Sequence, residues 1–152
     1  MSKILLRLIP PFWTAIYLVI AWGISLTAPW RKFVDLRVVG LGIALVLLGV
    51  ALAFWAFGLF RREDTELQPT SETNRKLVVS GPYRLTRNPM YMGLVLVSLG
   101  IAFWVGSVPF FVVPLLVFVT TNFVHIPFEE GKMRRQFGVG YDNYTRSVGR
   151  WM

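Results

Sequence analysis

Residues 88–128 read NPMYMGLVLVSLGIAFWVGSVPFFVVPLLVFVTTNFVHIPF and contain no aspartate, glutamate, lysine or arginine over 41 positions. A helix rises about 1.5 Å per residue, so a stretch of this length can cross a hydrocarbon layer of about 30 Å twice. Near its middle, residues 106–109 read GSVP, which combines small turn residues with a proline. The stretch therefore predicts two membrane-spanning helices joined as a tight hairpin, at about residues 90–105 and 109–125.

Two further stretches lack charged residues for 23 positions each, at residues 8–30 and 38–60. Each is long enough to cross the membrane once. The whole chain is 55% hydrophobic and only 16% charged, with a mean hydropathy of +0.55. We therefore predict an all-α polytopic membrane protein with about four transmembrane helices. Lys3 and Arg7 give the first stretch some likeness to a signal peptide, but its length and the lack of a cleavage motif favour a mature helix.

The distribution of basic residues predicts the orientation. With four crossings, the N-terminus, the loop after the second crossing and the C-terminal tail share a side and carry 13 of the 16 basic residues. The other side carries only Arg31, Lys32 and Arg37. The positive-inside rule then places both termini and the long loop in the cytoplasm, with the helices in the cytoplasmic (inner) membrane. We interpret the net charge of +8 as topology and contact with anionic lipid, not as nucleic-acid binding.

The chain is expected to form one membrane-embedded domain over residues 1–152. Residues 1–60 would supply a two-helix scaffold facing lipid, and residues 61–152 a loop, the helical hairpin and the tail. The chain has no cysteine, which excludes disulfides, thiolate metal sites and a cysteine nucleophile, and we predict no metal site.

The tail, from residue 129, has the pattern of an amphipathic helix. Pro127 suits the first turn of a new helix, and Gly138 and Gly140 are expected to interrupt it. Six apolar and aromatic residues recur at spacings of three or four, which puts them on one helical face. They are Met133, Phe137, Tyr141, Tyr144, Val148 and Trp151. We expect this tail to lie back on the membrane surface or on the other helices.

Polar residues stand at both ends of the predicted hairpin, at residues 83–91 and 125–130. Taken singly, each has a structural explanation: the carboxylates complement a helix dipole, the arginines lie at the membrane interface, and His125 bonds a neighbour. Because the hairpin brings its two ends together, and because polar groups at membrane depth mark functional sites, we predict a cytoplasm-facing pocket between them.

Two segments carry a family resemblance. LVVSGPYRLTRNPMYMG (residues 77–93), followed by EEGKMRRQFGVGYDNYTRSVGRW (residues 129–151), resembles the signature of the integral-membrane methyltransferases. That family includes isoprenylcysteine carboxyl methyltransferase and the phosphatidylethanolamine N-methyltransferases. Its pattern is Leu-Val, Gly-x-Tyr and Arg-His-Pro-x-Tyr-x-Gly, then Glu-Glu, Phe-Gly, two spaced tyrosines and Val-x-Arg. The match runs from about residue 65 to residue 151, and short prokaryotic members are similar.

The resemblance implies S-adenosylmethionine as the methyl donor, with S-adenosylhomocysteine as its product. It also implies a lipophilic acceptor that enters from the bilayer, such as an isoprenylcysteine-like carboxylate, a phospholipid amine or another hydrophobic small molecule. The residues it assigns to the donor are Gln68, Arg75, Lys76, Leu77, Val78, Tyr83, Asn88, Pro89, Met90, Tyr91, Glu129 and Glu130. We expect His125 to face the acceptor, with Arg87 or Arg134 beside it as further candidate catalytic residues.

Two positions depart from the family pattern. Asn88 replaces the usual histidine and cannot titrate, so proton transfer at this position is not expected. His125 stands where isoprenylcysteine enzymes carry an arginine that meets the substrate carboxylate. A histidine clamps a carboxylate less well, although it can act as a base toward an amine or a hydroxyl.

Two alternatives remain open at this point. Sterol-type membrane reductases, which use NADPH, share a related Arg-His-Pro-x-Tyr motif, although their chains are longer and have more crossings. A small membrane protein without catalytic activity, assembled with a partner, could carry the same polar residues as a structural or lipid-headgroup site.

Overall fold

The structure is a computed structural model that describes residues 9–27, 35–62 and 77–152. Within these ranges the chain is helical and contains no strand, so the all-α prediction is confirmed. The elements are α2 (Pro10–Thr27), α4 (Val39–Arg62), the 3-10 turn η1 (Gly81–Arg84), α5 (Pro89–Val105), α6 (Val108–Thr120), the π turn η2 (Thr121–His125), α7 (Ile126–Phe137) and α8 (Val139–Ser147).

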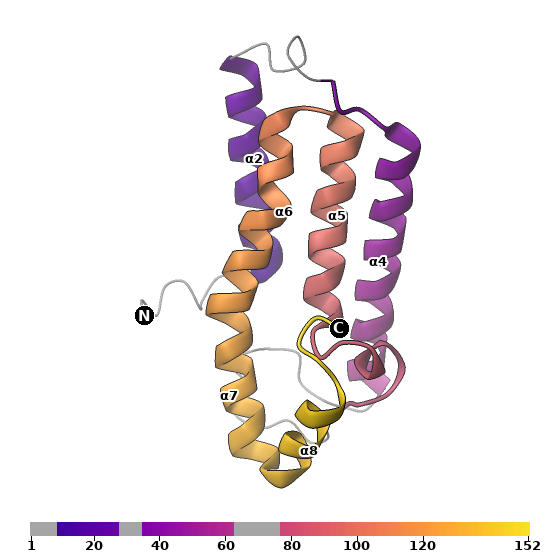
Figure 1. The fold of residues 1–152 in the computed structure, drawn as a ribbon, viewed down its shortest axis with the longest axis vertical. Helices are drawn as coiled ribbons and strands as arrows, with labels where there is room; N and C mark the ends of the chain where they lie inside the picture. The colour runs from indigo at the N-terminus through magenta and orange to yellow at the C-terminus, as the bar shows by residue number, and fades with distance from the viewer. Residues whose placement is uncertain (1–8, 28–34, 63–76) are drawn as a thin grey trace.

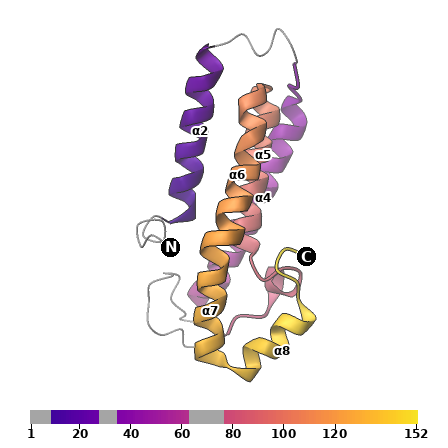
Figure 2. The same cartoon turned by 60° about the vertical axis from the view of Figure 1, so that its left-hand side comes forward.

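The long helices stand side by side in the order α2, α6, α5, α4 (Figure 1). The first two helices of the chain therefore flank the hairpin on opposite sides: α2 packs mainly on α6, whereas α4 packs on α5. The starts of α2 and α5 and the end of α4 all face the end of the molecule that α7 and α8 occupy (Figures 1 and 2). Polar segments far apart in sequence are thereby gathered at this end.

Three helices of the described chain are long and apolar enough to cross a membrane, at Pro10–Thr27, Val39–Leu59 and Val108–Phe137. The fourth apolar helix, α5, has 17 residues and is shorter. A hydroxyl pair joins two of these helices, since the Tyr17 and Thr120 oxygens lie 2.7 Å apart.

The hairpin turns at Gly106, as predicted from GSVP. Gly106 adopts φ +73°, and its N–H donates to the Ala102 carbonyl at 2.8 Å. Residues 35–38 cover this turn, because the Val38 N–H donates to the Phe103 carbonyl at 2.9 Å. A Cβ at position 106 would lie 2.5 Å from the Cβ of Arg37, so both the backbone angle and the close approach require glycine.

The second arm of the hairpin does not end at His125. It continues without a non-helical residue through η2 into α7, so residues 108–137 form one long helix with a π turn inside it. In that turn the Ile126 N–H donates to the Thr121 carbonyl, five residues back. Pro127 follows directly, and since proline lacks an N–H and crowds the carbonyl four residues earlier, a widened turn accommodates it without ending the helix.

The break in the tail comes at Gly138, where φ is +48°. The expected interruption is confirmed there, whereas Gly140 lies inside α8. The predicted apolar face is consequently divided between two helices that point in different directions (Figure 2).

Helices α4 and α5 approach each other at four glycines. Gly49 faces Gly93 and Gly42 faces Gly100, seven residues apart along each helix. A Cβ added to Gly49 would lie 2.6 Å from the Gly93 carbonyl oxygen, and one added to Gly100 would lie 2.6 Å from the Gly42 carbonyl oxygen. Small residues that let backbones touch are a main source of helix association in lipid. One face of α4 is thus a packing surface and not a lipid-facing one.

Replacing Gly49 with alanine should destabilise the protein. The added methyl meets backbone and cannot be accommodated by a rotamer change, so overpacking should cost about 1–3 kcal/mol and exceed the gain in helix propensity. Gly58→Ala is the matched control, since a Cβ there meets nothing within 4 Å. Thermal unfolding in detergent should show a lower midpoint for Gly49→Ala and an unchanged or higher one for Gly58→Ala. Equal midpoints would refute the close α4–α5 packing.

Candidate functional site

The two arms of the hairpin meet through Tyr91 and Glu129. Tyr91 lies in the first turn of α5, is buried, and donates its hydroxyl to Oε1 of Glu129 on α7. His125 stands one helical turn before Glu129, with its ring centroid 6.4 Å from that of Tyr91. The hairpin therefore brings together a phenol, a carboxylate and an imidazole that come from both of its ends.

The imidazole of His125 is the least satisfied polar group of this cluster. His125 is only 2% exposed, and its Nε2 has no hydrogen-bond partner among the described residues. A buried polar atom left without a partner costs free energy of about 1–3 kcal/mol. Such an atom is an available donor or acceptor for a molecule placed beside it.

Tyr83 enters from η1 on the side of α4. It is 6% exposed and packs with Ala56 and Val78, with Met90 partly buried against them. Its backbone carbonyl accepts a hydrogen bond of 2.6 Å from the Tyr144 hydroxyl on α8.

Burial keeps the tyrosines outside the spanning helices protonated. It raises the pKa of Tyr83 and of Tyr144 well above the ordinary value of 10, and the nearby Glu129 carboxylate raises that of Tyr83 further. Burial likewise raises the pKa of Tyr141 to about 12. At neutral pH these groups are therefore neutral hydrogen-bonding phenols.

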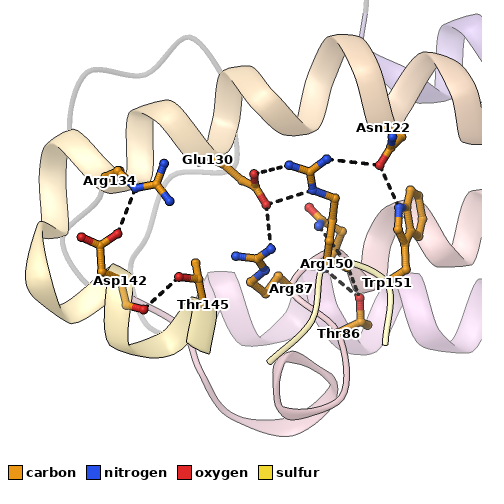
Figure 3. Close-up of polar contacts among 10 residues, drawn as sticks. Thr86, Arg87, Asn122, Glu130, Arg134, Asp142, Thr145, Arg150 and Trp151 are labelled. Atoms are coloured by element: carbon orange, nitrogen blue, oxygen red, sulfur yellow. Dashed lines mark hydrogen bonds and ion pairs between the residues drawn. The ribbon is translucent and has the colours of Figure 1, made fainter. Parts of the chain in front are cut away.

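Glu130 makes a different set of contacts from its neighbour Glu129. Its carboxylate accepts two hydrogen bonds from Arg150, one from Nη2 at 2.6 Å and one from Nε at 3.2 Å. It also forms an ion pair with Nη2 of Arg87 at 3.1 Å (Figure 3). The fork-to-carboxylate geometry with Arg150 is the strong form of this interaction. The Arg87 Nε is buried and has no partner among the described residues.

The backbone around Arg150 is tied to the loop that precedes α5. The Arg150 carbonyl accepts from Oγ1 of Thr86 at 3.0 Å and from Nδ2 of Asn88 at 2.9 Å. The Arg87 N–H donates to the Gly149 carbonyl at 3.0 Å. Asn88, at 9% exposure, is thus turned toward residues 149–150.

Trp151 fastens the same segment to the other arm of the hairpin. Its indole N–H donates to Oδ1 of Asn122 at 3.0 Å, and Nη1 of Arg150 reaches the same oxygen at 3.3 Å (Figure 3). The Trp151 ring also lies 4.8 Å, centroid to centroid, from that of Phe118.

Several predicted site residues lie elsewhere. Arg134 is exposed and its Nε contacts Asp142 of α8 at 2.9 Å, so it is not part of the Tyr91–Glu129–His125 cluster (Figure 3). Leu77 is half-buried in a segment without regular secondary structure, and Pro89 begins α5. Gln68, Arg75 and Lys76 fall outside the described residues.

Four residues of this region were not among the predicted site residues: Thr86, Asn122, Arg150 and Trp151. Asn122 could have been predicted from the sequence, because it is an amide in a long apolar stretch. Polar residues at membrane depth tend to have a specific partner. Arg150 belongs to the Val-x-Arg pattern of the tail. The residues that Arg150 contacts depend on the tertiary structure, and the spacing of residues in the sequence does not reveal them.

A family model described as phospholipid methyltransferase matches residues 37–140, more than half of the chain. The chain belongs to the phospholipid methyltransferase family. It is also similar to the methanethiol S-methyltransferase of Pseudomonas deceptionensis, with 32% identity over 72% of this chain and 40% of that protein. It is 30% identical to the protein-S-isoprenylcysteine O-methyltransferase B of Arabidopsis thaliana, over 70% of this chain and 55% of that protein.

The chain thus spans about half the length of these curated relatives. No solved structure matches it. The family match includes Tyr83, Tyr91, His125 and Glu129, but it ends at residue 140, before Arg150.

The cluster suits the methyl donor that the family resemblance implies. A sulfonium donor offers a cation, ribose hydroxyls, an amino group and a carboxylate. The Glu129 carboxylate can accept from hydroxyls or the amino group, the rings of Tyr83 and Tyr91 can lie beside a cation, and the unpartnered Arg87 Nε can donate to a carboxylate. The described residues contain no group of three or more histidines or carboxylates that could hold a metal ion.

Removing the Tyr144 hydroxyl should loosen this end of the molecule. Tyr144→Phe leaves the Tyr83 carbonyl without its donor, so the free energy of unfolding should fall by about 1–3 kcal/mol. Tyr141→Phe is the control, because Tyr141 is a second buried tyrosine of α8, at 4% exposure against 9% for Tyr144. Chemical unfolding in detergent would compare them, and equal stabilities would contradict the role given to the Tyr144–Tyr83 bond.

Proposed function

We propose that the protein is an integral membrane methyltransferase that uses S-adenosylmethionine and acts on a lipophilic acceptor at the cytosolic face of the membrane. One observation supports this most: within the family-matched residues, Tyr91 and Glu129 bond across the two arms of the hairpin. Beside them lies His125, whose Nε2 has no hydrogen-bond partner among the described residues. Fold alone does not define activity, so the proposal rests on these side chains.

Glu129 and the tyrosines are assigned to the donor. When bound, S-adenosylmethionine supplies an electrophilic methyl group on a positive sulfur, and the sulfur leaves as neutral S-adenosylhomocysteine when the acceptor atom takes the methyl. Tyr91 holds the Glu129 carboxylate in place through one hydrogen bond. The remaining lone pairs of that carboxylate can accept hydrogen bonds from the ribose hydroxyls or the amino group of the methyl donor. In such a displacement, the chain contributes mainly alignment and a complementary field.

His125 is assigned to the acceptor. It precedes Glu129 by one turn of a helix that runs from the apolar part of the molecule toward the polar end, so it lies about 6 Å farther from the polar end. A neutral imidazole can take the proton that an amine, thiol or hydroxyl releases on methylation. It lacks the fixed fork of an arginine, so these acceptors are favoured over a carboxylate such as that of isoprenylcysteine.

The donor assignment predicts a separation of two effects. Glu129→Gln removes the charge while keeping the shape, so affinity for S-adenosylhomocysteine should fall about tenfold or more. His125→Ala should leave this affinity within about threefold, yet lower turnover by about 10²–10⁴-fold through loss of the base. Calorimetry on detergent-purified protein measures the first effect. An assay with labelled methyl donor and total membrane lipid, followed by mass identification of the product, measures the second.

The same titrations discriminate the other candidate functions. Stabilisation by NADPH and not by S-adenosylhomocysteine would favour a sterol-type reductase. Binding of neither compound would favour a non-catalytic protein that assembles with a partner. Arg146→Gln is a suitable control variant, because Arg146 is exposed on α8 and makes none of the contacts described above.

The proposed orientation can be tested because the chain has no cysteine. Single cysteines can replace Asp35, beside the hairpin turn, and Asn143, on α8, both of which are exposed. A membrane-impermeant maleimide should label Asp35→Cys in intact spheroplasts, and Asn143→Cys only after permeabilisation. The reverse pattern would show that the proposed cytosolic end faces outward.

A further inference from the structure

We propose that residues 149–151 form a clamp that sets the distance between α5 and α7, with Arg150 and Asn88 as positioning residues for the methyl donor. This inference rests on the proposed function. Here "clamp" means Gly149, Arg150 and Trp151 together with the bonds that they make to Thr86–Asn88 and to Asn122 and Glu130.

Arg150 joins the same two elements as the Tyr91–Glu129 bond. Its carbonyl accepts from Thr86 and Asn88 immediately before α5, and its guanidinium holds Glu130 of α7. Glu130 is the residue next to Glu129, and Asn88 is three residues before Tyr91. The clamp therefore runs beside the Tyr91–Glu129 bond and restrains the two backbones from which that bond is made.

The side chain of Asn88 bonds the clamp and does not cap α5. It is the N-cap residue of α5, yet its side chain makes no capping bond, and its amide N–H donates to the Arg150 carbonyl instead. The amide is 9% exposed, so water does not replace this bond freely. In this chain the asparagine found in place of the family's histidine thus acts on the position of α5 through residue 150.

The ion pairs give the clamp its rigidity. Arg150 uses Nε and Nη2 on Glu130 and Nη1 on Asn122, which fixes the plane of its guanidinium. Trp151 also bonds Asn122, and its ring makes a tilted contact with that of Phe118. Gly149, Arg150 and Trp151 lie beyond residue 140, so the family match includes their partners but not these three residues.

Asn88→Asp is the sharpest test, since it keeps the shape and turns a donor toward the Arg150 carbonyl into an acceptor. Loss of one hydrogen bond of this strength corresponds to about a tenfold weaker affinity for S-adenosylhomocysteine, with kcat at saturating donor within about threefold of wild type. In the protein without ligand, hydrogen exchange of the peptide containing the Arg87 amide, which bonds Gly149, should accelerate by about tenfold as this region opens locally. Arg150→Gln should likewise weaken the affinity and accelerate the exchange, with kcat again within about threefold of wild type.

Two further variants serve as controls for a general loss of folding. Thr86→Val removes a donor to the same carbonyl and the acceptor of the Asn88 backbone N–H, and should show shifts of the same sign, while Arg146→Gln should show none. Unchanged exchange and unchanged affinity in Asn88→Asp would overturn the clamp, as would equal losses in Arg146→Gln. If the wild-type protein itself does not bind S-adenosylhomocysteine, the proposed function fails, and the exchange measurement alone then decides whether the clamp holds α5.

Discussion

The position of α5 depends on its backbone contact with α4. Apolar side chains gain little by leaving lipid for one another, so membrane helices stay together where their backbones can approach closely. Gly42, Gly49, Gly93 and Gly100 provide that approach, with carbonyl oxygens where side chains would otherwise stand. The end of α4 then supplies Ala56, against which Tyr83 packs, and the start of α5 supplies Tyr91. One wall of the candidate site is therefore placed by a backbone contact that extends along α5 from Gly93, two residues after Tyr91, to Gly100.

The opposite wall depends on the π turn. A residue added to an α-helix rotates all that follows by about 100°, so the widened turn at Thr121–His125 decides which side of α7 faces α5. With α7 rotated in this way, Glu129 bonds Tyr91, and Glu130 bonds Arg87 and Arg150. Adjacent carboxylates thus have separate partners, one a phenol and the other a pair of guanidinium groups.

The charge-free stretches and the GSVP turn were enough to predict the helical class and the hairpin, because a bilayer admits few other solutions. The same reasoning placed a helix start at Pro127, where the helix in fact continues through the π turn, a feature with no simple sequence signature. The family motif indicated Tyr91 and Glu129, which do meet. It could not indicate that Thr86 and Asn88 donate to a main-chain carbonyl at residue 150, because every residue carries that acceptor.

The two sides of the cluster are held very differently. Around Glu129 and Glu130, contacts from α5, α8 and residues 149–151 restrain nearly every polar group. His125 has no such restraint: its Nε2 is buried, unpartnered among the described residues, and nearer the apolar part of the molecule. A fixed cofactor is best held by groups that are already in place, because pre-organised groups need no rearrangement when charge moves. In our proposal, the variable, lipophilic acceptor meets one free polar atom beside an apolar surface, and this atom is Nε2 of His125.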